Sequence, residues 1–256
     1  MKNQFSMKKF FYLIILLLFF FDCSNVKKEN VNEWITLFNG ENVDGWRGYN
    51  SDLMPLGWDV IDGVLTFKND QSSEEDYNYD RGQKNIIYAL EEFDNFELYV
   101  EWKIPVGGNS GIFYHIQENN GGSPEYQLID DINYASIHDL EPYNKSVGFE
   151  NPSKLHPLQQ TASDYGMYEA NSKIKVFNPA GEWNSSRIIF TEKEVEYWLN
   201  GKKVLSFTPW SDDWYERKNS GMYRDNKDYG ESRTGYIGFQ DYGDDLWLRN
   251  IKIRKL

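Results

Sequence analysis

An all-β sandwich is the fold class that this 256-residue sequence predicts, and three observations lead to it. Aromatic residues make up 17% of the chain, and their side chains suit the half-buried surface of a pleated sheet. Short alternating or apolar runs recur from Trp34 onward, separated by Gly, Asn, Asp and Pro. Long stretches rich in Ala, Leu, Glu and Lys are missing, so a helical bundle is not expected.

The strands are expected where β-branched, aromatic and other apolar residues cluster between turn residues. Asp62-Gly63 and Asn200-Gly201 lie between such runs, where a two-residue hairpin turn requires positive φ, so they predict two hairpins. Gly111 and Gly235 predict close backbone approach or strand bending. The expected strands are Trp58–Ile61, Val64–Lys68, Ile86–Leu90, Phe96–Ile104, Gly111–Gln117, Glu125–Ile129, Ser186–Phe190, Val195–Leu199, Lys203–Phe207, Gly235–Gln240 and Leu246–Arg254.

Two regions show no strand or helix periodicity. Residues 69–85 form an acidic stretch that contains tyrosines, and residues 130–182 form a long irregular span. Loops of such length inside a compact domain are usually functional, often as lids or binding walls. We therefore expect part of the functional site to come from these two regions.

The first 22 residues are expected to be a signal peptide. Three lysines precede the unbroken apolar run 10–21, which is too short for an ordinary membrane span of about 20 residues. Cys23, the only cysteine, follows directly and is expected to carry a lipid after cleavage, the alternative being an incidental cysteine. Residues 23–33 are polar and are expected to form a tether, so the membrane would be contacted through the lipid anchor only.

Charge and composition limit the remaining function classes. Acidic residues outnumber basic ones by 40 to 27, for a formal net charge of −13 at pH 7. Non-specific nucleic-acid binding requires a basic surface, so no nucleic-acid partner is expected. Residues 34–256 show neither an internal repeat nor a second composition regime, and a single domain is expected there.

Seven segments, in order along nearly the whole mature chain, carry a resemblance to a known family. They are Trp34-Ile-Thr-Leu-Phe-Asn-Gly-Glu-Asn-Val-Asp-Gly-Trp46, Asn109-Ser-Gly-Ile-Phe113, Glu125-Tyr-Gln-Leu-Ile-Asp130, Pro179-Ala-Gly-Glu-Trp-Asn184 with Arg187, Val195-Glu-Tyr-Trp-Leu-Asn-Gly201, Gly235-Tyr-Ile-Gly-Phe-Gln-Asp-Tyr-Gly243 and Leu248-Arg-Asn-Ile-Lys-Ile-Arg254. Together they resemble the 3-keto-disaccharide hydrolase domain family. Many members have histidine where this chain has Tyr242, and several have it at Tyr236.

The resemblance implies a concanavalin-like jelly roll of two antiparallel sheets with a concave face toward carbohydrate. It also implies an exported bacterial protein, periplasmic or an outer-membrane lipoprotein, which agrees with the reading of residues 1–23. A partner oxidoreductase that makes the 3-keto sugar is a further implication.

The candidate catalytic residues are Glu125, Asp130, His115 and His138. In a regular strand Glu125, Gln127 and Asp131 would share one face, because side chains alternate. The family resemblance favours Asp130 instead, which requires the strand to end or bulge there. A solvated edge strand with ordinary carboxylates remains the alternative.

The three histidines, His115, His138 and His156, lack the short spacing of compact metal sites, and each is also compatible with a structural role. A divalent metal assembled from His138, Glu125 and Asp130 remains open. No other cofactor is expected.

Sugar recognition requires aromatic platforms beside polar groups, because sugar rings present apolar C–H faces edged by hydroxyls. Tyr114, Tyr165, Trp183 and Arg224 lie in or beside the loops and family motifs and are candidates for this role. Trp102, Trp198 and Trp247 are assigned to core or sheet packing. The list of expected substrate-binding residues is completed by Asn109 and Gln127.

Three functions remain in competition. A conventional retaining glycosidase carries two carboxylates about 5–5.5 Å apart, usually from a Glu-x-Asp-x-x-Glu strand that is absent here, since Glu97 and Glu101 have the wrong spacing. Chemistry on a 3-keto-glycoside, by elimination and then hydration, follows from the family resemblance and is the leading prediction. Glu125 or His138 would be the base, and His115 or Asp130 a second acid/base or metal ligand. The third function is a non-catalytic carbohydrate-binding lectin on the same fold.

Overall fold

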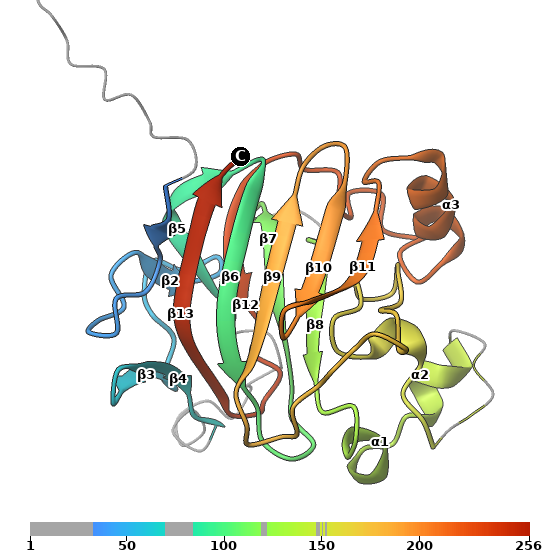
Figure 1. Cartoon of the computed structure of the whole chain (residues 1–256), viewed down its shortest axis with the longest axis horizontal. Helices are drawn as coiled ribbons and strands as arrows, with labels where there is room; N and C mark the ends of the chain where they lie inside the picture. The colour runs from blue at the N-terminus through green and yellow to red at the C-terminus, as the bar shows by residue number, and fades with distance from the viewer. Residues whose placement is uncertain (1–32, 70–83, 119–121, 147–148, 150, 152) are drawn as a thin grey trace, which may run out of the picture. The chain divides into compact units, whose positions relative to one another are not determined.

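Two antiparallel β-sheets pack face to face in the computed structural model, which describes residues 33–69, 84–118, 122–146, 149, 151 and 153–256 (Figure 1). The described residues belong to one compact unit. The expected signal peptide, the lipidation at Cys23 and most of the polar tether lie outside the described residues. Within the described part of the chain, no helix has the length and apolar character needed to cross a membrane.

The larger sheet has eight strands. Its outer surface faces the viewer in Figure 1. In spatial order the strands are β11 (Lys202–Phe207), β10 (Val195–Leu199), β9 (Asn184–Phe190), β6 (Phe96–Lys103), β13 (Leu246–Lys255), β4 (Val64–Phe67) and β3 (Trp58–Ile61), with β1 (Ile35–Thr36) beside β13. Along β9, buried and half-buried side chains alternate strictly. One face of this sheet therefore lines the core.

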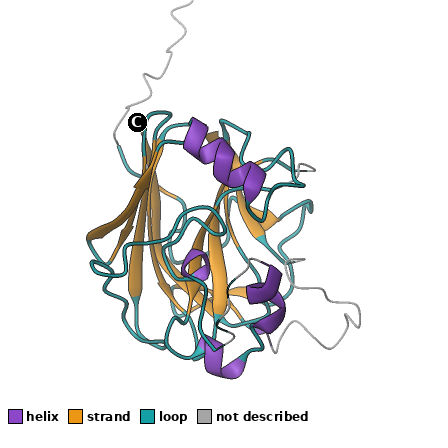
Figure 2. Ribbon diagram, turned by 90° about the vertical axis from the view of Figure 1, so that its right-hand side faces the viewer, coloured by secondary structure: helices purple, strands orange, loops and turns teal. Residues whose placement is uncertain are grey.

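The smaller sheet has five strands and forms the second layer (Figure 2). In spatial order they are β2 (Trp46–Gly48), β5 (Ile86–Phe93), β12 (Gly235–Phe239), β7 (Asn109–Ile116) and β8 (Glu125–Ile129). The core between the layers contains the fully buried side chains of Trp102, Ile112, Tyr126, Ile188 and Leu248. Such an interleaved, non-sequential strand order is what a jelly-roll sandwich requires.

The short helices lie along the side of the sandwich that carries β8 and β11 (Figure 1). They are α1 (Tyr134–Ile137), α2 (Glu141–Ser146), a 3₁₀ turn (Pro157–Gln159) and α3 (Asp212–Ser220). At the start of α3 the Ser211 hydroxyl accepts a hydrogen bond from the Trp214 amide at 3.3 Å. The segment that follows α3 leads back to β12 and forms part of the cavity described below.

The all-β jelly-roll prediction is confirmed, and each of the expected strands is present with end points shifted by three residues at most. Both hairpin turns are confirmed, since the turn residues have the positive φ that their Asp-Gly and Asn-Gly sequences predict: 52° and 78° at residues 62–63, and 46° and 77° at 200–201. The sequence did not predict β1 and β2, which at two and three residues are too short to alternate. It also missed α3, whose sequence is polar nearly throughout.

A β-bulge in β7 decides which side chains face the core. The pairing of β12 with β7 shifts register between Tyr236, opposite Ile116, and Gly238, opposite Phe113. His115 has φ of +52° in this bulge, so both Tyr114 and His115 point inward, and both rings contact Phe190. The next residue is thereby returned to the outer face of the five-stranded sheet.

Burial holds His115 in its neutral form. Its Nε2 donates a hydrogen bond to the Asp94 carbonyl at 2.8 Å, and its ring centroid lies 4.3 Å from that of Phe190. Burial lowers the pKa of His115 to about 4. Because the unfolded chain takes up this proton near pH 6.5 and the folded chain does not, the residue destabilises the fold as the pH falls through that window.

We expect wild type to lose about 3 kcal/mol of unfolding free energy between pH 7 and pH 4 through this residue. His115→Asn, which tolerates positive φ, removes that titration. Urea unfolding gives the unfolding free energy of both proteins at pH 7 and pH 4. The advantage of wild type over the variant in this free energy should be smaller at pH 4 than at pH 7. Equal pH dependence in the two proteins would contradict the buried neutral histidine.

Candidate functional site

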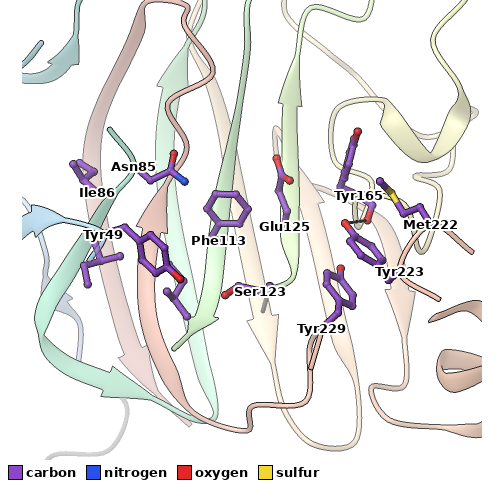
Figure 3. A pocket seen from close by; sticks show the side chains of 13 residues that line it. Tyr49, Asn85, Ile86, Phe113, Ser123, Glu125, Tyr165, Met222, Tyr223 and Tyr229 are labelled. Atoms are coloured by element: carbon purple, nitrogen blue, oxygen red, sulfur yellow. Dashed lines mark hydrogen bonds between the residues drawn. The ribbon is translucent and has the colours of Figure 1, made fainter. Parts of the chain in front are cut away.

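A cavity of about 320 Å³ lies on the face of the five-stranded sheet that points away from the core. Figure 3 shows its lining side chains. Three strands form its floor: β5 supplies Ile86 and Ile87, β7 supplies Phe113 and Ile116, and β8 supplies Glu125. Its walls come from loops, and they contain Tyr49, Asn85, Ser123, Tyr165, Met222, Tyr223 and Tyr229.

The carboxyl group of Glu125 occupies space that a missing side chain leaves free. Glu125 pairs with Phe113 on the neighbouring strand, and its side chain extends over Gly111. A Cβ at position 111 would lie 2.1 Å from Oε1 of Glu125, so any other residue there would displace the carboxyl group. Gly111 therefore lets the side chain of Glu125 lie against the sheet, whereas the sequence predicted close backbone approach or strand bending at this glycine.

Burial gives Glu125 an unusual protonation equilibrium. Its side chain is buried, and removal from water, with a smaller contribution from the nearby Asp164 carboxylate, raises its pKa to about 8. Burial also raises the pKa of Asp164 to about 8. Near neutral pH Glu125 therefore exchanges readily between a proton donor and a base, which is the property of a general acid–base catalyst.

Asp164 is held from the core side by Tyr197, which is itself hydrogen-bonded to Tyr114. The hydroxyl of Tyr197 donates to Oδ1 of Asp164 at 3.4 Å, and the hydroxyls of Tyr197 and Tyr114 are 2.8 Å apart. The backbone continues this link, because the amide of Tyr165 donates to the carbonyl of Glu125 at 3.0 Å. This arrangement attaches the segment around Asp164 to the edge of β8.

A pair of stacked tyrosines forms one wall. The ring centroids of Tyr223 and Tyr229 are 3.4 Å apart with planes 9° from parallel, and Trp214 stacks beyond Tyr229. The hydroxyl of Tyr223 donates to the carbonyl of Tyr165 at 3.0 Å. The hydroxyl of Tyr229 is buried and interacts with the hydroxyl of Tyr223, and burial together with this neighbour raises the pKa of Tyr229 well above its ordinary value. Tyr229 therefore stays a neutral hydroxyl beside the cavity.

Of the residues that the sequence singled out, Glu125 and Tyr165 are brought together in this cavity. Gln127 lies two residues along the same strand but is buried outside the lining, where its Oε1 accepts from the amide of Leu128 at 3.0 Å. The strand ends at Ile129, which explains why the predicted alternation does not continue to Asp131. Asp131 instead binds Lys175 through Oδ2 at 2.7 Å.

A second group of candidates lies around α1 and does not line the cavity. The carboxylate of Asp130 accepts hydrogen bonds from the amides of Gly107, Ile132 and Asn133, and it thereby closes a loop. His138 Nε2 hydrogen-bonds the carbonyl of Gly107 at 3.0 Å. These contacts hold the loop around α1 and place Asp130 and His138 outside the cavity lining, and their catalytic role stays a prediction.

Asn109 is buried beside the same loop. Its amide nitrogen lies 3.5 Å from the hydroxyl of Tyr134, and its side-chain oxygen has no hydrogen-bond partner among the described residues. It stands outside the cavity lining, so this position does not support the predicted contact with the substrate at that cavity.

The four remaining candidates lie in the core or on other surfaces. Tyr114 and His115 are buried in the core, where they cannot stack on or protonate a sugar in the cavity. Trp183 lies against Arg249 and Lys103 on the solvent side of the eight-stranded sheet. Arg224 is exposed and pairs with its neighbour Asp225. The predicted substrate contacts of Trp183 and Arg224 are not supported by these positions.

The metal ligand set considered from the sequence is not assembled. Glu125 lines the cavity, whereas His138 and Asp130 hold the loop around α1. Across the described ranges, no three His, Cys, Asp or Glu side chains are grouped to hold a metal ion. The third histidine, His156, caps the 3₁₀ turn by accepting from the Leu158 amide.

Sequence reasoning missed Asp164, Met222, Tyr223 and Tyr229. The irregular span 130–182 was expected to supply a binding wall, and Asp164 and Tyr165 lie within it. Met222, Tyr223 and Tyr229 lie between α3 and β12, and only two aromatic residues in a stretch without strand periodicity mark them in the sequence. Their position over β8 depends on tertiary packing, for which the sequence has no local signal.

Comparisons with known proteins agree with this fold and with the family resemblance. Residues 33–254 match the model of the 3-keto-alpha-glucoside-1,2-lyase-like domain. The chain is 33% identical over 250 residues to the 3-keto-disaccharide hydrolase of Bacteroides thetaiotaomicron, a match that covers 87% of this chain and 78% of that protein.

Two crystal structures from Parabacteroides distasonis, both of candidate glycosyl hydrolases, are also similar. The first has a TM-score of 0.74 at 36% identity and covers 87% of this chain and 94% of its own. The second has a TM-score of 0.58 at 28% identity, with coverages of 88% and 100%. The chain therefore belongs to the family of the 3-keto-alpha-glucoside-1,2-lyase-like domain.

Proposed function

We propose that this protein is a glycoside-cleaving enzyme that acts on 3-keto-glycosides, with Glu125 as its general base. The observation that carries the proposal is a buried carboxyl group, with a pKa of about 8, in a cavity whose wall also contains Tyr229. The names of the family and of its Bacteroides relative support the same substrate class.

The chemistry requires one base and one stabiliser of negative charge. The ketone at C3 acidifies the proton on C2, which Glu125 removes to form an enolate. The enolate then re-forms the ketone, creates a C1–C2 double bond and breaks the bond from C1 to the leaving oxygen, which takes the proton from Glu125. Water then adds to C1 and a proton returns to C2, which completes net hydrolysis.

Tyr229 is assigned to the enolate oxygen. Its ring is stacked against Tyr223 and Trp214, so the side chain loses little conformational entropy when the hydroxyl is oriented toward a ligand. A preorganised donor in a site with little water stabilises a developing oxyanion far more than a donor in bulk water does. The burial that raises the pKa of Glu125 thus also strengthens the contribution of Tyr229.

The two alternative functions fit this site less well. A retaining glycosidase needs two carboxylates that both reach the substrate, and Glu125 is the one carboxylate in the lining formed by the described residues. Asp164 hydrogen-bonds Tyr197 on the core side instead. A lectin has no use for a buried carboxyl group that exchanges its proton near neutral pH, since that burial costs stability.

The reaction can be followed by NMR in D₂O with benzyl 3-keto-glucoside and, separately, with the unoxidised parent glucoside. We expect release of benzyl alcohol from the keto substrate alone, with deuterium incorporated at C2, because the base exchanges its proton with solvent. Parallel samples with a chelator report whether a metal ion participates. Cleavage of the parent glucoside would favour a two-carboxylate glycosidase, and binding of sugar without turnover would favour a lectin.

Glu125→Gln is expected to lower kcat about 10³-fold, within the range that general bases contribute, because the amide cannot accept the C2 proton. Glu182→Gln, at an exposed glutamate outside the cavity, is the matched control and should retain wild-type kcat. Steady-state kinetics on the same keto substrate measure both. Retention of turnover by the Glu125 variant would remove Glu125 from the mechanism.

The same Glu125→Gln variant is expected to gain stability at alkaline pH. A carboxyl whose pKa rises from 4.5 to about 8 on folding contributes almost no penalty below pH 4.5. Its penalty grows as the pH rises from 4.5 to 8, where only the unfolded chain is ionised, and is constant above 8. The amide does not titrate. The unfolding free energy of the variant minus that of wild type should therefore be on the order of 4 kcal/mol larger at pH 9 than at pH 4. Chemical denaturation at the two pH values tests this; a pH-independent difference would contradict the raised pKa.

A further inference from the structure

The cavity has two halves of different chemistry on either side of Glu125 (Figure 3). On one side stand Tyr165, Tyr223 and Tyr229, with hydroxyl groups and the reacting carboxyl nearby. On the other side stand Phe113 and Tyr49, together with the isoleucines of β5 and β7. We call this second set, made of Tyr49, Ile87, Phe113 and Ile116, the apolar half.

Backbone geometry builds the apolar half. Gly238 of β12 pairs with Ile87 on one side and with Phe113 on the other, so these two side chains flank a residue that has none. A Cβ at position 238 would lie 2.6 Å from Cδ1 of Ile116 and 3.2 Å from Cγ2 of Ile87. The glycine thus lets the two isoleucines close over β12, and the bulge at His115 turns Ile116 to this face.

A sugar ring would be a poor occupant of this half. A second hexose would bring several hydroxyl groups into contact with isoleucine and phenylalanine side chains, and each buried hydroxyl without a partner costs about 1–3 kcal/mol. Among the described lining residues, the side-chain polar groups near this half are the hydroxyls of Tyr49 and Ser123 and, at the rim, the amide of Asn85. Asn85 already uses its side-chain oxygen to accept from the Asp241 amide at 2.7 Å.

We infer that the group expelled from C1 is an aromatic alcohol, bound in the apolar half against Tyr49 and Phe113, while the 3-keto ring lies by Glu125 and Tyr229. This inference rests on the proposed function and specifies its substrate class. A planar ring gains from burial against isoleucine and from edge or stacked contacts with Tyr49 and Phe113. Unlike a hexose, such a ring brings no hydroxyl groups of its own into the apolar half.

Three substrates test the inference: benzyl 3-keto-glucoside, methyl 3-keto-glucoside and a 3-keto-glucosyl-glucose. Each expels an ordinary alcohol, so differences in rate reflect binding rather than the acidity of a phenol. We expect kcat/KM for the benzyl substrate to exceed both others by about tenfold or more. Equal or better cleavage of the disaccharide would overturn the inference and leave the proposed function intact.

Matched variants at Tyr49 test whether the preference for the benzyl substrate arises in the apolar half. Tyr49 is half-buried in the loop after β2 and lies outside the proposed catalytic groups. Tyr49→Gln should lower kcat/KM for the benzyl substrate about fivefold and leave the methyl substrate unchanged, and Tyr49→Phe, which keeps the ring, should match wild type. An equal loss on both substrates would contradict binding of the aromatic group at Tyr49.

Turnover of none of the three substrates would refute the proposed function instead. In that case calorimetric binding of unoxidised benzyl glucoside and of a glucosyl-glucose to the wild-type protein still tests the inference. Preference for the benzyl compound, lost in Tyr49→Gln and kept in Tyr49→Phe, supports an aromatic-binding half. Preference for the disaccharide overturns it.

Discussion

The bulge in β7 is the constraint on which both faces of the five-stranded sheet depend. By adopting positive φ, His115 places itself and Tyr114 together in the core, where each contacts Phe96 and Phe190. Tyr114 in turn meets Tyr197, which donates to Asp164 behind Glu125. On the opposite face the same bulge delivers Ile116 to the cavity. A single extra residue thus links the packing of the core to the electrostatic environment of the site and to the shape of its floor.

Two glycines complete that arrangement, one in β7 itself and one in the neighbouring strand β12. Gly111 leaves room for the carboxyl group of Glu125 over β7, and Gly238 leaves room for Ile87 and Ile116 over β12. Neither glycine has positive φ, so their role is to avoid contact rather than to permit an unusual backbone. Both halves of the cavity therefore depend on a glycine inside a strand, although glycine is otherwise unfavourable there.

The sequence predicted the fold well because its signals are local. Alternation, Asp-Gly and Asn-Gly are each visible within a few residues, and they located the strands and both hairpins. Of the candidate site residues, Glu125 and Tyr165 line the cavity. Tyr114 was predicted to bind substrate and His115 to act as an acid/base or metal ligand, because nothing local in the sequence reveals the bulge that buries both. Asp130 and His138 carry functional residue types but hold a loop, and Tyr229 reaches the cavity only because α3 and its following segment fold back toward β8. These are consequences of tertiary packing, which a single sequence does not show.

The cost of burying Glu125 also separates an enzyme from a binding protein on this fold. Two carboxyl groups, Glu125 and Asp164, are buried close enough for the charge on one to raise the pKa of the other, and ionisation of either opposes folding. A sugar-binding surface would gain hydrogen bonds from an exposed carboxylate without that penalty. A base that must remove a weakly acidic C–H proton gains from it, because desolvation raises its proton affinity toward the working pH. The proposed proton transfer thus gives the burial of Glu125 a function that sugar binding alone does not require.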